Sequence, residues 1–189
     1  MTPCQHILLR LMILLSIMTL IRSVRGQVPQ YGSECWFADN AVIVGDVIMG
    51  NNCTVWFSAV IRGDVNSIRI GNNTNIQDNV TIHGTYEKAS TTIGNHVSIG
   101  HNAVVHGCTI EDNVLIGIGA IVLDNAVVKS GSIVGAGAVV KAGFIIEENS
   151  IYGGIPARKL KEIDEENKEM TKRIAKNYNL YAGWFKNKD

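Results

Sequence analysis

Aliphatic residues recur at almost every sixth position along this chain, and short polar stretches separate them. From Ile93 onward the chain divides into units such as IGNHVS and IGHNAV and, further on, IEDNVL and IGIGAI. Insertions interrupt the period at residues 62–69 and 83–92. A period of six fits neither an amphipathic helix nor a hairpin meander, and it is typical of short strands joined by tight turns. The residues that open the units are Phe37, Ile43, Met49, Val55, Ile61, Ile70, Ile76, Ile82, Ile93, Ile99, Val105, Ile110, Ile116, Val122, Val128, Val134, Val140, Ile146 and Tyr152.

This period predicts an all-β solenoid. Three units make one coil of a triangular prism, and successive coils stack at a strand spacing of about 4.8 Å. We expect the openers, and the small residues two positions before them, to face the core. Asn and Gly are expected in the turns because they tolerate left-handed backbone conformations. Nineteen openers at three per coil predict about six coils; a β-sandwich of short strands is the alternative.

Residues 1–25 form an N-terminal extension that lies outside the repeat. It contains an apolar run from Leu11 to Ile21, which is too short to span a bilayer. The run can be read as the apolar region of a signal peptide or an anchor, as a short helix, or as sequence upstream of a true start at Met18. The cytoplasm is the predicted location, with export or membrane anchoring through residues 1–25 as the alternative.

The repeat domain is predicted over residues 26–156, and residues 157–189 are predicted to form a C-terminal amphipathic α-helix and tail. Charged residues dominate after Pro156, and apolar residues recur there at helical spacing. We expect this helix to pack along the prism or against a neighbouring subunit. The residues of its apolar stripe are Leu160, Ile163, Met170, Ile174 and Tyr181.

Composition excludes several classes of function. The formal net charge is zero and no basic run is interleaved with aromatic residues, so neither nucleic acid nor an anionic membrane surface is an expected partner. Cys35, Cys53 and Cys108 each stand two residues before an opener, where we expect buried thiols. With no CxxC motif, the sequence does not predict a disulfide framework.

Three histidines carry the candidate chemistry. His83 directly follows opener Ile82 and His106 directly follows opener Val105, and these openers are three units apart. We therefore expect both imidazoles on one edge of the prism, one strand spacing apart, where they can share a metal with bonds of about 2.1 Å. Arg62 has the same phase, one coil before His83.

His101 is predicted on a different edge, with Asp78 one coil before it and Gln77 beside Asp78. One chain cannot easily bring the three imidazoles together, whereas a three-fold trimer can. The edge with Arg62, His83 and His106 would meet the edge of the next subunit, and Arg62 would face Asp78 there as a charge pair. Closed cyclic symmetry would then produce three identical metal sites. Neutral imidazoles with an open coordination position favour zinc or a similar divalent ion.

The chain resembles the γ-class carbonic anhydrase family, whose members are left-handed parallel β-helices of hexapeptide repeats. The resemblance covers roughly residues 20–161. It rests on five short motifs, which are specific only in combination: Arg62-Gly63-Asp64, Asn75-Ile76-Gln77-Asp78, Thr81-Ile82-His83, Ile99-Gly100-His101 and Val105-His106-Gly107-Cys108.

The resemblance implies a homotrimer with one divalent metal per subunit interface, zinc being favoured over iron and cobalt. His83 and His106 would come from one subunit and His101 from its neighbour. Gln77 would orient metal-bound water or hydroxide, and Arg62 and Asp78 would form an interfacial salt bridge. Asp64 and Asn75 would support that arrangement, and the reaction would be the reversible hydration of carbon dioxide to bicarbonate.

Two positions depart from the pattern of the family's best-studied active members. Acidic residues that serve proton transfer are replaced here by Val65 and Tyr86, although Glu87 is adjacent. Loss of such a group slows the export of a proton. Two alternatives follow: a metal-binding homologue with little hydratase activity, and a hexapeptide-repeat acyltransferase that uses acetyl-CoA and one catalytic histidine.

Overall fold

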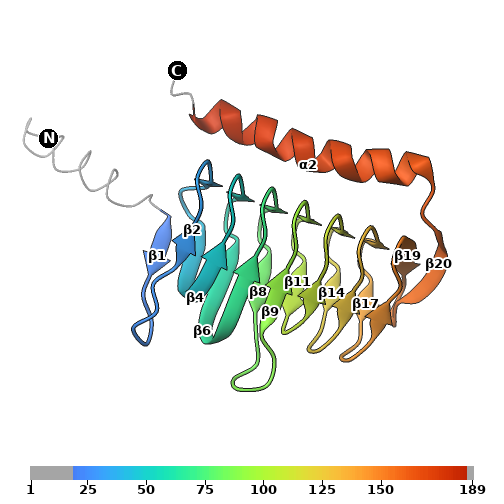
Figure 1. Cartoon of the computed structure of the whole chain (residues 1–189), viewed down its shortest axis with the longest axis horizontal. Coiled ribbons are helices and arrows are strands. Elements are labelled where there is room, and N and C mark those ends of the chain that lie inside the picture. Colours follow the sequence, from blue (N-terminus) through green and yellow to red (C-terminus); the bar gives the residue numbers. More distant parts are fainter. Residues whose placement is uncertain (1–18, 187–189) are drawn as a thin grey trace, which may run out of the picture.

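The chain winds into a parallel β-helix (Figure 1). Aliphatic side chains stack in columns inside it, coil upon coil. The structure, a computed structural model, describes residues 19–186. Openers pair in register across the coils, so that Ile99 lies between Ile76 and Ile116. All three are fully buried. The predicted all-β solenoid is therefore confirmed.

The strands form three faces of a prism. On the first face lie β1 (Leu20–Arg22), the first parts of β4 (Val42–Met49) and β6 (Val60–Ile70), β8 (Thr81–His83), β11 (Val104–His106), β14 (Ile121–Val122) and β17 (Val139–Val140). On the second lie β2 (Gln30–Tyr31), the later parts of β4 and β6, β9 (Thr91–Ile93), β12 (Thr109–Ile110), β15 (Val127–Val128) and β18 (Ile145–Ile146). On the third lie β3 (Trp36–Phe37), β5 (Thr54–Val55), β7 (Asn75–Ile76), β10 (Ser98–Ile99), β13 (Leu115–Ile116), β16 (Ile133–Val134) and β19 (Ser150–Gly153).

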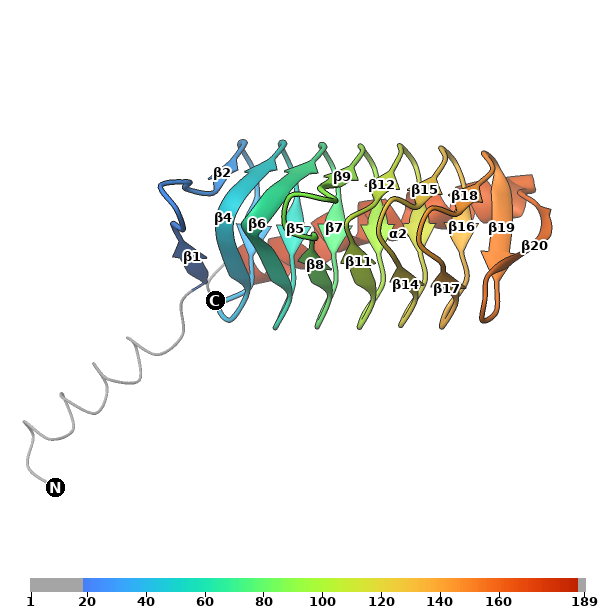
Figure 2. The same ribbon diagram turned by 90° about the horizontal axis from the view of Figure 1, so that it is seen from below.

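The first insertion, residues 62–69, does not leave the solenoid as a loop. It continues β6, which pairs with β8 at one end and with β9 at the other, so the strand bends from the first face to the second (Figure 2). The second insertion does form a loop after β8, closed by a bridge between Thr85 and Ala89.

Asparagine occupies the turn positions that need a left-handed backbone, as predicted. Asn side chains also link neighbouring turns, because Asn95 Oδ1 accepts a hydrogen bond from the backbone N–H of Asn72 at 2.9 Å. The turn asparagines with positive φ are Asn52, Asn73, Asn79, Asn102, Asn113, Asn125 and Asn149.

The solenoid has seven coils rather than the predicted six. The third face carries an eight-stranded sheet in which only β20 is antiparallel, which leaves seven strands and thus seven coils. The prediction counted Phe37 of the first coil but missed the other two strands of that coil: β1, because residues 1–25 were set aside, and β2, which was not recognised as a unit. In the structure Ile21 pairs in register with Ile43, so the chain joins the sheet before residue 26.

The C-terminal helix begins later than predicted. Residues 158–162 form β20 (Arg158–Glu162), which pairs antiparallel with β19 and covers the free edge of the last coil. Helix α2 (Glu165–Lys186) then begins behind Asp164, whose carboxylate accepts the backbone N–H of Asn167 at 2.9 Å as an N-cap. Leu160 therefore belongs to a strand and not to the helical stripe.

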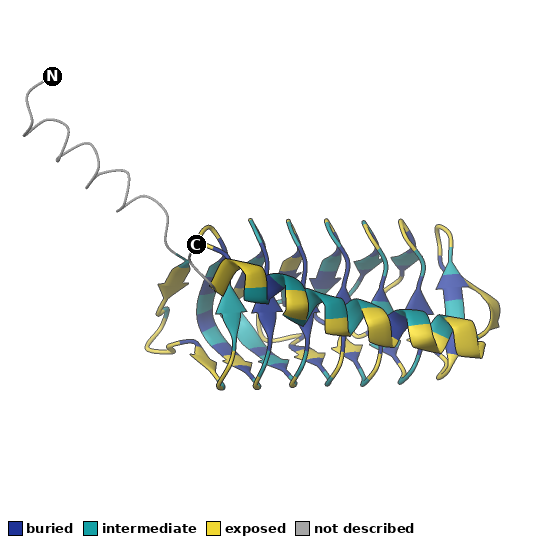
Figure 3. Cartoon of the chain, turned by 90° about the horizontal axis from the view of Figure 1, so that it is seen from above, coloured by how far each residue is buried: buried dark blue, intermediate teal, exposed yellow. Residues whose placement is uncertain are grey.

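Helix α2 packs along the third face of its own solenoid, the first of the two predicted positions (Figure 3). It runs back toward the N-terminal end of the prism, where Phe185 packs on Trp36 with ring centroids 5.3 Å apart. Midway, Tyr178 packs edge-on against Trp56 at 5.2 Å. These aromatic contacts hold α2 against the third face, where Tyr178 also contacts His101, two residues after β10.

The predictions for residues 1–18 lie outside the described residues. Among residues 19–186, no helix has the length and apolar character needed to cross a bilayer. The predicted cytoplasmic location stays a prediction.

The two isoleucines of β18 provide a matched test of the core. Ile146 is fully buried and its neighbour Ile145 is about half exposed. We expect Ile146→Ala to lower the free energy of unfolding by about 2–5 kcal/mol, because it removes buried methyl groups and leaves a cavity. Ile145→Ala should change it by about 0.5 kcal/mol or less. Urea unfolding followed by circular dichroism measures both, and equal effects would contradict the inward orientation of Ile146.

Candidate metal centre

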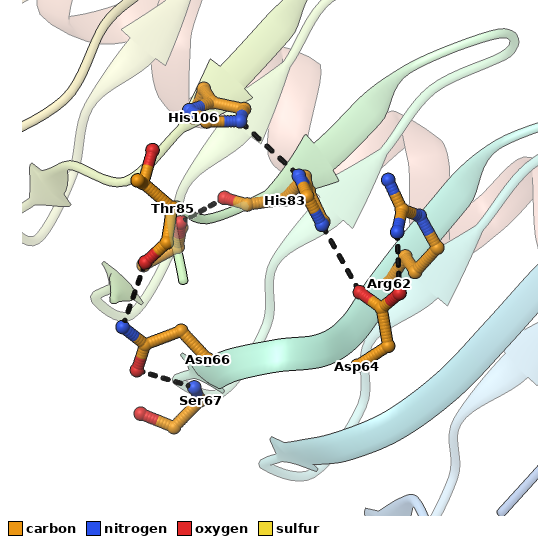
Figure 4. A network of polar contacts seen from close by, with 8 residues as sticks. Arg62, Asp64, Asn66, Ser67, His83, Thr85 and His106 are labelled. Carbon is orange, nitrogen blue, oxygen red and sulfur yellow. Dashed lines mark hydrogen bonds and ion pairs between the residues drawn. The ribbon is translucent and has the colours of Figure 1, made fainter. Parts of the chain in front are cut away.

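His83 and His106 lie side by side at one corner of the prism, at the ends of β8 and β11. The two residues pair directly in the β8–β11 register, as predicted. His83 Nδ1 and His106 Nε2 are 3.2 Å apart, and the ring centroids are 5.2 Å apart (Figure 4). We call this the histidine-pair corner.

A carboxylate binds the far nitrogen of each ring. His83 Nε2 lies 3.1 Å from Asp64 Oδ1, and His106 Nδ1 lies 2.5 Å from Asp124 Oδ1. A carboxylate accepts hydrogen bonds, so each of these nitrogens carries the proton in a neutral ring. The two nitrogens that face each other are then both lone pairs.

This arrangement fits a cation. Two lone pairs at 3.2 Å repel each other unless a positive charge lies between them. Two nitrogen ligands of tetrahedral zinc, with bonds of about 2.0–2.1 Å, are about 3.3 Å apart. The carboxylates that orient the rings are the partners that metal-bound histidines usually have. The donor set therefore suits zinc or a similar divalent ion.

Asp124 was not predicted as a site residue. Val122 pairs with Val105, so Asp124 stands level with Gly107, the residue after His106. A side chain at residue 107 would collide with the Asp124 carboxylate, so the glycine makes room for it. Thr85 also donates a hydrogen bond to Asp124, at 2.5 Å. The six-residue period could have identified Asp124, because it stands two residues after Val122, the opener three units after Val105.

Arg62 lies one coil from His83, as predicted, because Ile61 pairs with Ile82. Its guanidinium binds the Asp64 carboxylate at 2.5 Å (Figure 4). Burial raises the pKa of Asp64, but hydrogen bonds from Arg62 and His83 outweigh this effect and hold the pKa below its usual value. Burial lowers the pKa of His83 despite its bond to Asp64. An ionised carboxylate and a neutral imidazole therefore face each other near pH 7.

His101 lies at a different corner, after β10 on the third face. Ile99 pairs with Ile76, which places His101 level with Asp78, as predicted. His101 Nδ1 contacts Asp78 Oδ2 at 2.8 Å, and His101 Nε2 contacts the Tyr178 hydroxyl of α2 at 3.0 Å. In a neutral ring whose Nδ1 donates to the carboxylate, Nε2 accepts the hydrogen bond of the Tyr178 hydroxyl. Tyr178 was not predicted, because the hexad period says nothing about how α2 packs.

Gln77 is buried beside this corner in a single orientation. Its Oε1 accepts the backbone N–H of His101 at 3.2 Å, and its Nε2 donates to Asn75 Oδ1 at 3.1 Å. Asn75 in turn donates to Ser98 Oγ at 2.7 Å. The chain of amides leaves one N–H and one lone pair of Gln77 free for a ligand.

One chain brings together two of the three predicted histidine ligands. Within residues 19–186, no group of three His, Cys, Asp or Glu side chains is placed to hold a metal. Each corner therefore presents an incomplete donor set.

Tyr86 is half exposed in the loop after β8, with the guanidinium of Arg25 5.7 Å from its ring centroid.

Comparisons with known proteins agree with the hexad pattern. The family profile described as "Bacterial transferase hexapeptide (six repeats)" matches residues 107–142. The chain is 48% identical over 141 residues to a probable carbonic anhydrase of Methanocaldococcus jannaschii, covering 75% of this chain and 88% of that protein. The chain belongs to the γ-carbonic anhydrase-like family of hexapeptide-repeat proteins. The predicted family is thus confirmed.

Two further similar proteins differ from this chain in length or carry the name of a different activity. The chain is 39% identical over 167 residues to gamma carbonic anhydrase 1, mitochondrial, of Arabidopsis thaliana; the match covers 86% of this chain but only 61% of that protein's length. The structure superimposes with a TM-score of 0.85 on a putative acetyltransferase of Bacillus cereus, at 34% identity, covering 89% of this chain and 97% of that one.

Proposed function

We propose that this protein is a metal-dependent carbonic anhydrase that hydrates carbon dioxide reversibly to bicarbonate at the interfaces of a homotrimer. The observation that carries the proposal is the histidine-pair corner. His83 Nδ1 and His106 Nε2 face each other at 3.2 Å while carboxylates bind the opposite nitrogens. His101 of a neighbouring subunit would supply the third nitrogen.

The residues around these ligands have separate tasks. Asp64 and Asp124 hold the protons of His83 and His106 away from the ligand nitrogens. A divalent ion held there would supply Lewis acidity, which lowers the pKa of water to about 7. The amide chain from Ser98 through Asn75 holds Gln77 in one orientation, so that its free polar atoms can direct a water molecule toward carbon dioxide.

Arg62 and Asp78 are proposed to meet across the subunit interface. Within one chain Arg62 binds Asp64, and Asp78 binds His101. A guanidinium has five N–H donors, so Arg62 can keep its bond to Asp64 and donate to a second carboxylate. The interface would then join the two histidine corners through charge as well as through the metal.

Proton export is the step that this chain is least equipped for. Hydration of carbon dioxide produces bicarbonate and one proton, and the proton must leave the site. Val65 and Tyr86 stand where an acidic side chain would carry it. We therefore propose slow turnover in dilute buffer, with a metal-binding homologue of little activity as the limiting case.

An acyltransferase that uses acetyl-CoA is the second candidate, favoured by the fold shared with the putative acetyltransferase of Bacillus cereus. That chemistry needs one catalytic histidine as a base. It gives no reason for two imidazoles with facing lone pairs, each oriented by its own carboxylate. Metal analysis of protein purified without chelator separates the two, because the acyltransferase predicts no metal and tight binding of acetyl-CoA.

Removal of one ligand should abolish the reaction. We expect His106→Ala to lower stopped-flow hydration of carbon dioxide to the background rate, because the donor set loses a nitrogen. His96→Ala, which removes an exposed turn histidine, is the matched control and should leave the rate unchanged.

Chains with His101→Ala mixed with chains with His83→Ala should regain some activity, since some interfaces are then whole. Verified mixed trimers without activity would refute a shared site.

The carboxylate behind His106 should tune metal affinity. We expect Asp124→Asn to weaken metal binding about 10–100-fold, the usual effect of losing such an outer partner. Asp112 has the same phase after its opener, but its Oδ1 accepts a backbone N–H of Asn95 at 2.7 Å, so Asp112→Asn is the control. Titration against a chelating dye measures both affinities. Equal affinities for the two variants would argue against metal binding at His106.

Tyr178 should compete with the metal for His101. Its hydroxyl donates to the nitrogen lone pair that a metal would need. A hydrogen bond contributes about 0.5–1.5 kcal/mol net, so Tyr178→Phe should tighten metal binding about two- to tenfold. Tyr181→Phe, on the same helix, is the control. Weaker binding by the Tyr178 variant would mean that the hydroxyl positions the ring instead of blocking it.

A further inference from the structure

Two cysteines lie next to each other near the N-terminal end of the solenoid. Trp36 and Thr54 pair in register between β3 and β5, so Cys35 and Cys53, which precede them, stand at the same level of adjacent coils. The backbone N–H of Trp36 donates to the carbonyl of Cys53 at 2.9 Å. Neither cysteine has a part in the proposed metal chemistry.

The two sulfurs have different surroundings. Cys35 is partly exposed, and its thiol donates to the Gly50 carbonyl at 3.2 Å, in the coil that carries Cys53. Cys53 is fully buried, and its thiol is 3.1 Å from the Gly71 carbonyl in the next coil. Contact between the thiols lowers the pKa of Cys35 and, together with burial, raises that of Cys53. Cys35 is thus the accessible thiol and the better nucleophile of the pair.

We propose that Cys35 and Cys53 form a reversible disulfide in exchange with low-molecular-weight disulfides such as glutathione disulfide. The Cys35 thiolate attacks one sulfur of the reagent, which forms a mixed disulfide and releases one thiolate. Cys53 then loses its proton and attacks Sγ of Cys35, which releases the second thiolate. The two protein thiols are oxidised, and one reagent disulfide is reduced to two thiols.

The geometry allows this bond and makes it easy to reduce. Adjacent parallel strands place paired Cα atoms about 4.8 Å apart, inside the range of about 4.4–6.8 Å found across disulfides. Side chains of in-register parallel partners point the same way, so their Cβ atoms start farther apart than the mean of about 3.8 Å for disulfides. The resulting strain raises the reduction potential, which is typical of labile rather than structural disulfides.

A purely structural role is the competing explanation. Thr74 occupies the same position in the next coil, and its hydroxyl donates to the Gly94 carbonyl at 3.1 Å. Thiols and hydroxyls could therefore serve only as donors to turn carbonyls. That role does not require sulfur in two adjacent coils, nor a cysteine that is partly exposed.

The test is oxidation of the full chain with glutathione disulfide, followed by non-reducing peptide mapping. We expect a peptide that joins Cys35 to Cys53 and is separated again by dithiothreitol. Cys53→Ser should instead keep glutathione on Cys35, because the resolving thiol is gone, and Cys35→Ser should leave Cys53 unmodified. Buried Cys108 is the internal control. The mapping also separates any product of Cys4, which lies outside the described residues.

Three outcomes would overturn the proposal. The first is a stable glutathione adduct on Cys35 in the unsubstituted chain, since Cys53 would then not resolve it. The second is modification of Cys108 as fast as Cys35, which would mean that unfolding exposes the thiols. The third is no reaction at Cys35, in which case both cysteines act only as hydrogen-bond donors.

Discussion

In-register pairing between successive coils is the constraint on which the rest of this structure depends. Each opener sits directly above the opener three units earlier, as Ile99 sits between Ile76 and Ile116. Parallel strands of one sheet are about 4.8 Å apart, so residues of equal phase in neighbouring coils are held in contact. The buried aliphatic column sets that phase, because a slip by one residue would turn every core side chain outward.

In-register pairing also brings residues that are far apart in the sequence together into the candidate metal centre. His83 and His106 meet because Val105 pairs with Ile82, and Asp124 reaches His106 because the next coil places it beside Gly107. Stacked coils can build a column of donors along one corner, but they keep separate corners apart. His101 therefore lies with Asp78 and Tyr178, away from the histidine pair.

The hexad period predicted the solenoid, the register of the two histidines and the level of His101 with Asp78. Three features escaped it for physical reasons. Strand β1 of the first coil was missed because the apolar run at residues 11–21 resembles a targeting segment, although Ile21 pairs with Ile43. Strand β20 was assigned to the helix because Leu160 fits a helical stripe, while the open edge of the last coil binds it as a strand. Tyr178 reaches His101 through the packing of α2, which is a tertiary contact with no periodic signature.

Under the proposed function, the metal ligands His83 and His106 lie at one corner of a chain and His101 lies at another. This separation couples metal binding to the assembly of the trimer. If the ion binds only where two subunits meet, metal binding and trimer assembly share one coupling free energy, and each must strengthen the other equally. The Tyr178 hydroxyl then opposes both, because it occupies His101 in the separate chain. Arg62 and Asp78 favour both, because each keeps hydrogen-bonding capacity beyond its partner in the same chain. The sign of each residue's effect on assembly should therefore match the sign of its effect on metal affinity.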